Sequence, residues 1–196
     1  MTAHHLGVPL ELVVVNLATG EQHAPAFLAL NPNHRVPVLE DAGFVLWESY
    51  AIQQYLAERT PGQTLYPTDA QARADISRWM HWCGQMLMPG AGTLNWERLY
   101  KGLSGQGAAD PAEEARAESS LRVAGQVLDQ HLSRRAWMCG EALSLADFAI
   151  AAPLADQHRA RYPLADFAHV QRWLRQVQEL PAWGATEAPA APALSS

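Results

Sequence analysis

Hydrophobic residues follow two different patterns along this chain, and the pattern changes near residue 65. Before that point, short apolar runs at residues 10–15, 38–39 and 44–46 are bounded by turn-forming residues, as is typical of β-strands. After it, apolar positions recur every three or four residues, as is typical of helices that pack on one face. The pattern therefore predicts an α+β domain over residues 1–60, a linker over residues 61–68 and an all-helical domain over residues 69–184.

Residues 38–46 predict a β-hairpin. Val38-Leu39 and Phe44-Val45-Leu46 favour strands, and Glu40-Asp41-Ala42-Gly43 between them is a turn-forming cluster. Ser49 then precedes apolar residues at helical spacing, so a helix should begin there with its first amide hydrogens unpaired. The start of such a helix favours a bound carboxylate.

Two prolines mark the other elements of the first part. Pro37 interrupts an apolar run and cannot donate a hydrogen bond to a sheet, so it predicts an edge, a bulge or a cis bend where a ligand could replace the lost partner. Residues 1–7 predict a short helix that ends at Gly7-Val8-Pro9, because Gly is favoured at a helix C-terminus and Pro just beyond it. Residues 10–15 then predict a strand.

The second part predicts several helices. We expect one from Thr68 or Asp69 that bends or ends at Met88-Pro89-Gly90, followed by a loop over residues 101–110. Another should begin at Pro111, capped by Asp110, and a last one should lie around residues 170–177. Residues 185–196, which are rich in Ala and Pro, predict a disordered tail.

Ser144-Leu145-Ala146-Asp147 has the pattern of a capping box at the start of a helix. In this box, the first and last side chains each satisfy an amide hydrogen of the first helical turn. We therefore assign Ser144 and Asp147 structural roles. Replacing Asp147 by Ala should lower stability by about 0.5–2 kcal/mol, the range for the loss of a helix cap.

Composition narrows the functional class. The chain has 196 residues, of which 48% are hydrophobic, and a formal net charge of −6. The acidic balance, with no basic cluster longer than Arg134-Arg135, argues against nucleic-acid binding. No apolar stretch is long enough for a membrane helix, and residues 1–5 do not resemble a secretion signal. We therefore expect a cytoplasmic protein that does not enter a membrane.

Metal and cofactor motifs are also missing from the sequence. Cys83 and Cys139 are too far apart for a Cys-x-x-Cys redox or zinc site, and His81 and Cys83 would point in different directions on a helix. The dinucleotide, phosphate-loop and nucleophile-elbow motifs are absent. We therefore expect a small-molecule ligand and no metal.

Five short motifs, taken in order, resemble those of the cytosolic glutathione transferases, in a theta- or phi-like bacterial group. They are Leu30-Asn31-Pro32, Val36-Pro37-Val38-Leu39, Glu48-Ser49, Leu65-Tyr66-Pro67 and Ser144-Leu145-Ala146-Asp147. The resemblance covers nearly the whole chain. It implies a thioredoxin-like first domain that binds glutathione and an all-helical second domain.

The resemblance also assigns residues to the ends and the centre of the glutathione site. It implies that the main chain of Val36, before a cis Pro37, pairs with the cysteinyl unit of glutathione, much as a peptide adds to a sheet edge. Glu48 and Ser49 would hold the γ-glutamyl end. The activity implied is conjugation of the glutathione thiol to a small, electrophilic, apolar substrate, in a homodimer.

The glycyl end of glutathione would lie near Arg35, whose guanidinium can form a charge-assisted hydrogen bond with a carboxylate. Gln22 and His23 fall where some relatives place a His-Lys pair. For the second substrate, the resemblance points to an apolar helix face in the second domain. That face carries Trp79, Met80, Cys83, Met86 and Leu87. Such a stripe is usually packed core or dimer surface, so we expect only one or two of these residues to line the pocket.

One family feature is missing from the amino-terminal residues. Relatives begin with a strand and a loop whose Ser, Tyr or Cys contacts the glutathione sulfur, whereas this sequence resembles them from the first helix onward. We expect the true start to lie upstream of Met1. The thiol-activating residue is therefore unknown, and His4, His5 and His23 are weak candidates for a general base.

Three functions remain open from the sequence. The first is a glutathione S-transferase. The second is a non-catalytic protein of the same fold that binds glutathione or a partner protein, which is also what an authentic start at Met1 would favour. The third is a glutathione-dependent thiol-disulfide oxidoreductase, because a cysteine could stand in the loop that is absent here.

Overall fold

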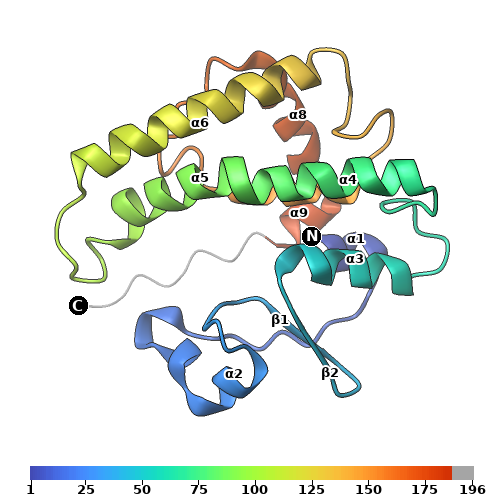
Figure 1. Cartoon of the computed structure of the whole chain (residues 1–196), viewed down its shortest axis with the longest axis horizontal. Coiled ribbons are helices and arrows are strands. Elements are labelled where there is room, and N and C mark those ends of the chain that lie inside the picture. Colours follow the sequence, from blue (N-terminus) through green and yellow to red (C-terminus); the bar gives the residue numbers. More distant parts are fainter. Residues whose placement is uncertain (187–196) are drawn as a thin grey trace.

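The computed structural model describes residues 1–186 and shows a small α+β part beside a larger helical part (Figure 1). This arrangement confirms the predicted fold class. The elements of the first part are α1 (Thr2–Leu6), η1 (Leu17–Thr19), η2 (Glu21–His23), α2 (Pro25–Leu30), β1 (Val38–Asp41), β2 (Phe44–Trp47) and α3 (Ser49–Arg59).

The helical part follows the loop over residues 60–69. Its elements are α4 (Ala70–Trp82), η3 (Cys83–Leu87), α5 (Met88–Asn95), η4 (Trp96–Tyr100), α6 (Pro111–Leu132), α7 (Leu145–Ala151), η5 (Ala152–Leu154), α8 (Ala168–Gln178) and α9 (Pro181–Gly184). No helix of the described residues is long and apolar enough to cross a membrane. The tail predicted over residues 185–196 lies, from residue 187 onward, outside the described residues.

The predicted hairpin is confirmed. Strands β1 and β2 pair antiparallel, with Val38 opposite Trp47 and Asp41 opposite Phe44. The two residues between the strands, Ala42 and Gly43, have φ angles of 49° and 87°. Two positive φ angles in a two-residue loop match the right-handed twist of the flanking strands, which explains the Gly at this position.

The strand predicted over residues 10–15 is wrong. These residues run without regular secondary structure, and Leu12, Val13 and Val14 are 77%, 80% and 85% exposed. A strand needs a hydrogen-bonded neighbour, but in the described part of the chain the sheet contains only β1 and β2. High β-propensity alone therefore does not organise this segment.

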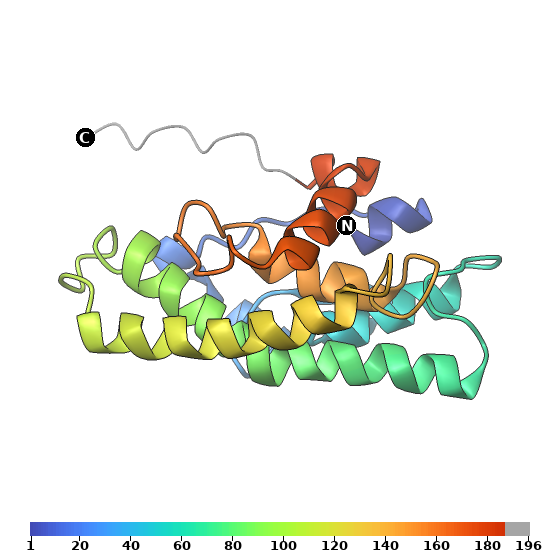
Figure 2. The ribbon, with the colours of Figure 1, turned by 90° about the horizontal axis from the view of Figure 1, so that it is seen from above.

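Helical structure continues through Pro89, so the helix does not end at residues 88–90. Elements α4, η3, α5 and η4 follow one another without a break from residue 70 to residue 100 (Figure 2). Elements η3 and η4 are π-helical, and η3 immediately precedes the α5 turn that contains Pro89. The wider turn of a π-helix changes the hydrogen-bond pattern at the place where proline has no amide hydrogen to donate.

The other predicted helices are present. Asp110 caps α6, because its Oδ1 accepts hydrogen bonds from the amides of Ala112 (2.8 Å) and Glu113 (3.4 Å). Helix α8 covers the segment expected around residues 170–177, and residues 101–110 form a loop. Helix α6 packs against both α5 and α8. The core between these helices includes the fully buried side chains of Leu121, Leu128 and Trp173.

The capping box at Ser144 and Asp147 is confirmed, and Asp147 does more than cap α7. Its Oδ2 accepts from the amide of Ser144 (2.8 Å) and from the hydroxyl of Ser144 (2.9 Å). Its Oδ1 accepts from the amide of Met138 and from Trp173 Nε1, both at 2.8 Å. Asp147 therefore joins α7, the preceding loop and α8.

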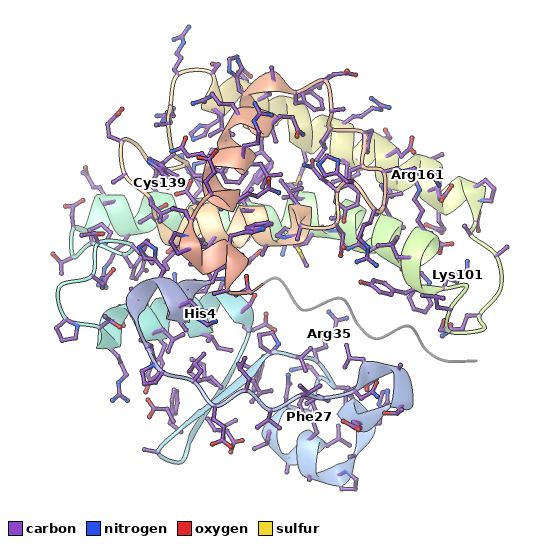
Figure 3. All side chains as sticks on the ribbon, turned by 180° about the vertical axis from the view of Figure 1, so that it is seen from behind. His4, Phe27, Arg35, Lys101, Cys139 and Arg161 are labelled. Atoms are coloured by element: carbon purple, nitrogen blue, oxygen red, sulfur yellow. The ribbon has the colours of Figure 1, made fainter. Side chains whose placement is uncertain are left out.

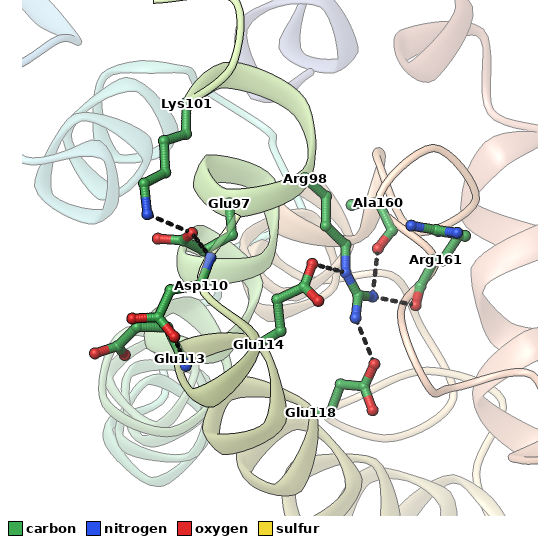
Figure 4. Close-up of polar contacts among 9 residues, drawn as sticks. All are labelled: Glu97, Arg98, Lys101, Asp110, Glu113, Glu114, Glu118, Ala160 and Arg161. Carbon is green, nitrogen blue, oxygen red and sulfur yellow. Dashed lines mark hydrogen bonds and ion pairs between the residues drawn. The ribbon is translucent and has the colours of Figure 1, made fainter. Parts of the chain in front are cut away.

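A second polar cluster joins α6 to the loop after η5, and it centres on the guanidinium of Arg98 (Figure 4). Arg98 forms ion pairs with Glu114 and Glu118 on α6. It also donates to the carbonyl oxygens of Ala160 and Arg161, both at 2.9 Å. With both carboxylates and both carbonyls satisfied by one side chain, this cluster fixes η4 against α6 and the loop.

Contacts between the two parts run mainly through α1 and α3. Helix α1 packs against α3 and also against α9, and α3 contacts α7. In the connecting loop, the carbonyl of Leu65, which is fully buried, accepts a hydrogen bond from the amide of Leu145 at 3.1 Å. The start of α7 and the start of the helical part are thereby held together.

Candidate functional site

The hairpin register places two of the predicted motifs side by side. Val36 and Pro37 come directly before β1, and Glu48 and Ser49 come directly after β2. Because Val38 pairs with Trp47, both motifs lie at the same end of the hairpin. The peptide bond between Val36 and Pro37 is cis, as predicted.

The main chain of Val36 is open for binding. The side chain of Val36 is 45% exposed, and its amide and carbonyl form no hydrogen bond within residues 1–186. Polar groups of the main chain strongly favour a hydrogen-bonding partner. An extended peptide could pair with both groups, which is the role predicted for this residue.

Asn31 fixes the loop that carries Arg35 and Val36, a role that was not predicted from the sequence. Its side chain is 2% exposed, and its Nδ2 donates to the carbonyl of Arg35 at 2.7 Å. Its Oδ1 accepts from both the amide and the Nδ2 of Asn33 at 3.0 Å. The Asn-Pro pair after a short helix was the available signal, because Asn side chains often stabilise turns by bonding to nearby backbone.

The start of α3 offers free donors beside Val36. Helix α3 begins at Ser49, as predicted, and Glu48 before it has a φ of 76°. The amides of Ser49 and Tyr50 and the hydroxyl of Ser49 have no hydrogen-bond partner in the described part of the chain. Three free donors together with the helix dipole suit an anion such as a carboxylate.

Positive and neutral polar groups precede Val36 in the chain. Arg35 is exposed, and its guanidinium has no ion-pair partner among the described residues; it points from the first part toward the helical part (Figure 3). His23 Nδ1 lies 3.0 Å from His34 Nδ1, so the two imidazoles share a hydrogen bond. His34 directly precedes Arg35 in the sequence. Unlike these histidines, Gln22 forms no hydrogen bond through its Oε1, which is buried and has no partner within residues 1–186.

The histidines of α1 do not join this group. His4 is exposed and lies well away from Arg35 (Figure 3). The ring of His5 packs on Phe148 of α7, with 5.5 Å between ring centroids, and burial lowers its pKa. Neither position supports a role as general base for a thiol bound at Val36.

Most of the apolar face predicted near the second substrate packs in the core, as expected for all but one or two of its residues. Trp79 is 8% exposed, and Met80, Cys83 and Leu87 are fully buried, whereas Met86 is 45% exposed. Element η4, which the sequence did not predict, presents Trp96 (37% exposed) and Tyr100 (44% exposed). It leads into Lys101, which lies across from the loop of Arg35 (Figure 3).

Neither cysteine has the properties of a reactive thiol. Burial raises the pKa of Cys83 to about 11, although a hydrogen bond with Tyr50 lowers it in part. Burial also raises the pKa of Cys139 to about 12. Both are free cysteines, and the described residues contain no group of three or more side chains that could hold a metal ion.

Comparison with known proteins assigns the chain to a family. Residues 1–58 match the family model of the glutathione S-transferase N-terminal domain, and residues 91–181 match that of the C-terminal domain. Glutathione S-transferase D6 of Drosophila melanogaster is 32% identical over 185 residues, which covers 93% of this chain and 82% of the relative. The chain therefore belongs to the glutathione S-transferase family.

Solved structures give the same assignment. A delta-class glutathione transferase of Nilaparvata lugens is 32% identical, with a TM-score of 0.76 over 90% of this chain and 80% of that one. A glutathione S-transferase of Pseudomonas fluorescens is 30% identical, with a TM-score of 0.83 over 92% of this chain and 87% of that one.

Proposed function

We propose that this chain acts as a glutathione S-transferase, which joins the thiol of glutathione to a small, electrophilic, apolar substrate. The observation that carries this proposal is the open main chain of Val36 beside the free donors at the start of α3. A peptide with a carboxylate at each end fits such a surface, since its backbone can pair with Val36 while one carboxylate is held at Ser49.

Each end of glutathione has a matching charge in this arrangement. Ser49 and the α3 amides bind the γ-glutamyl carboxylate, and the Glu48 carboxylate pairs with the γ-glutamyl ammonium. Arg35 and His23 bind the glycyl carboxylate. This division of roles is supported by family membership and by the position of the two motifs at one end of the hairpin.

The second substrate is proposed to lie against Trp96 and Tyr100 of η4. Both residues are partly exposed on η4, which leads into Lys101. Aromatic side chains supply apolar area at low conformational cost, and holding an electrophile near the thiol supplies much of the rate by proximity.

The residue that activates the thiol is unknown. A thiol of pKa about 8.5 is mostly protonated at neutral pH, so conjugation needs a group that stabilises the thiolate. The first strand and thiol-activating loop expected from the family remain a prediction. The alternatives are a non-catalytic protein of the same fold that binds glutathione or a partner protein, and a glutathione-dependent thiol-disulfide oxidoreductase.

Further proposals concern the subgroup, the assembly and the domain bounds of this chain. We place the chain in a theta- or phi-like bacterial group, supported by the order of its motifs and by the Pseudomonas fluorescens relative. We propose a cytoplasmic homodimer with a first domain over residues 1–60, a linker over 61–68 and a second domain over 69–184. Family membership supports this assembly and division.

Calorimetric titration of the whole chain with glutathione tests the proposal. Saturable binding is expected, and Ser49→Ala should weaken it about tenfold, because a charge-assisted hydrogen bond contributes roughly 1.5 kcal/mol or more. Ser120→Ala, an exposed serine in the middle of α6, is the control and should bind as the wild type does. Absence of wild-type binding would refute the proposal.

Two activity assays then separate the three functions. Turnover of a chlorinated nitroaromatic with glutathione identifies a transferase. Binding without turnover identifies a binding protein. Reduction of a glutathione mixed disulfide identifies an oxidoreductase.

A further inference from the structure

Tyr50 lies at the contact between the candidate site and the helical part. It is the second residue of α3, directly after Ser49, and it is half-buried against the core of the helical part. Its ring lies over Gly84, where an added Cβ would be 3.3 Å from Tyr50 Cε2 and 3.7 Å from the hydroxyl oxygen. Because Gly84 carries no side chain, the ring can approach the main chain of η3 this closely.

The hydroxyl of Tyr50 is held as well as its ring. Burial raises the pKa of the Tyr50 hydroxyl, and its interaction with Cys83, the first residue of the π-helical turn η3, raises this pKa further. Cys83 Sγ in turn donates to the carbonyl of Ala149 in α7 at 3.4 Å. Tyr50 is thereby connected to η3 and α7, both of which belong to the helical part.

We propose that Tyr50 is a positioning residue for glutathione, and that its contact with Gly84 and Cys83 sets where the first turn of α3 stands. The proposal rests on the function proposed above. Tyr50 is covalently next to Ser49, so a displacement of its ring moves the free amides that receive the γ-glutamyl carboxylate. Hydrogen bonds weaken steeply as their length and angle depart from the optimum, so a small displacement changes affinity.

Glutathione, and not the electrophile, is the substrate that this contact affects. The contact of Tyr50 with Gly84 involves the first turn of α3, which begins at Ser49. Trp96 and Tyr100 belong to η4, which follows α5. Disturbing the Tyr50 contact should raise the KM for glutathione while the KM for the electrophile stays the same. A change that merely destabilised the protein would not separate the two constants in this way.

Gly84→Ala is the test variant, because its methyl group would press on the Tyr50 ring at 3.3 Å. We expect a three- to tenfold weaker binding of glutathione. Gly90→Ala is the matched control in the same run of helices, since its methyl group would meet Leu121 Cγ at 2.9 Å and would strain the contact with α6 instead. It should lower the melting temperature at least as much and leave glutathione affinity unchanged.

A second substitution distinguishes the ring contact from a general effect. Replacing Tyr50 by Leu in the Gly84→Ala background removes the atoms that the new methyl group would press on. The double variant should therefore bind glutathione more tightly than the sum of the two single effects predicts, a non-additivity that is diagnostic of direct contact. Additive effects would overturn the proposal.

Hydrogen exchange on the ligand-free chain gives a readout that does not depend on glutathione. Exchange of the α3 amides should be faster in Gly84→Ala than in the wild type, and unchanged in Gly90→Ala. Unchanged exchange in Gly84→Ala, or equal glutathione affinity of Gly84→Ala and wild type, would overturn the proposal. If the wild type bound no glutathione, the proposed function would fall, and with it the assignment of Tyr50 to glutathione.

Discussion

At the scale of single residues, burial determines how the titratable groups of the helical part behave. Cys83 is fully buried, and this burial raises its pKa to about 11, while the hydrogen bond with Tyr50 opposes the shift. An unfolded cysteine titrates near pH 8.5. Between these two values the folded state holds its proton more tightly than the unfolded state does, so stability must fall as the pH rises.

We predict that the free energy of unfolding falls by about 2 kcal/mol between about pH 8.5 and pH 11 through Cys83 alone. Urea unfolding at several pH values, compared between the wild type and Cys83→Ala, measures this contribution. The wild type should lose more stability across the interval than the variant. Parallel pH profiles for the two proteins would show that Cys83 does not carry the effect.

At the scale of secondary structure, the predictions from sequence succeeded where local residues decide the outcome. The hairpin turn depends on Ala42-Gly43, the start of α3 on Ser49 and the start of α6 on Asp110, and all three lie where the pattern placed them. The failures occurred where distant partners decide. Residues 10–15 have no strand beside them, and the π-helical turn before Pro89 leaves no signature in hydrophobic spacing.

Asp147 provides the prediction at this scale, because its carboxylate joins α7 to α8 as well as capping α7. Asp147→Ala would leave the amide of Met138 and the Trp173 Nε1 without an acceptor inside the core. We expect a loss of about 3–5 kcal/mol, since each buried unpaired donor costs about 1–3 kcal/mol in addition to the lost cap. Denaturant unfolding gives the value.

Asp110→Ala is the matched control, because Asp110 caps α6 at an exposed position and joins no other helix through its side chain. Its loss should cost about 1 kcal/mol. Equal losses for the two variants would mean that Asp147 acts as a cap only, as its sequence pattern alone predicted.

At the scale of the whole molecule, the candidate site depends on how the two parts of the chain contact each other. The sequence predicted only the site residues of the first part. Val36, Glu48 and Ser49 belong to motifs that can be recognised locally. The contact of Tyr50 with Gly84 joins residues 34 positions apart in the chain, and neither residue type points to the other. The burial of Met80 and Cys83, which removes them from a substrate pocket, likewise follows from packing between helices.

We predict that copies of this chain associate through residues 10–15. These residues combine β-prone aliphatic residues, a single charge and high exposure at Leu12, Val13 and Val14, a combination that favours association between copies through unpaired strands. For the wild type, we expect particle size, measured by light scattering, to grow with protein concentration. Replacing Leu12 and Val14 by Lys should abolish this growth. Leu103→Lys, at an apolar residue that is 83% exposed in a loop, is the control and should change nothing. Identical scattering from all three proteins would refute the prediction.

The same open segment also bears on the fate of the chain in a cell. Holdase chaperones bind the aliphatic stretches that unfolding exposes, and such binding competes with the native state. Residues 10–15 present a stretch of this kind while the helical core is intact. Recognition of this segment by quality control would lower the abundance of the chain even if the core itself never opened.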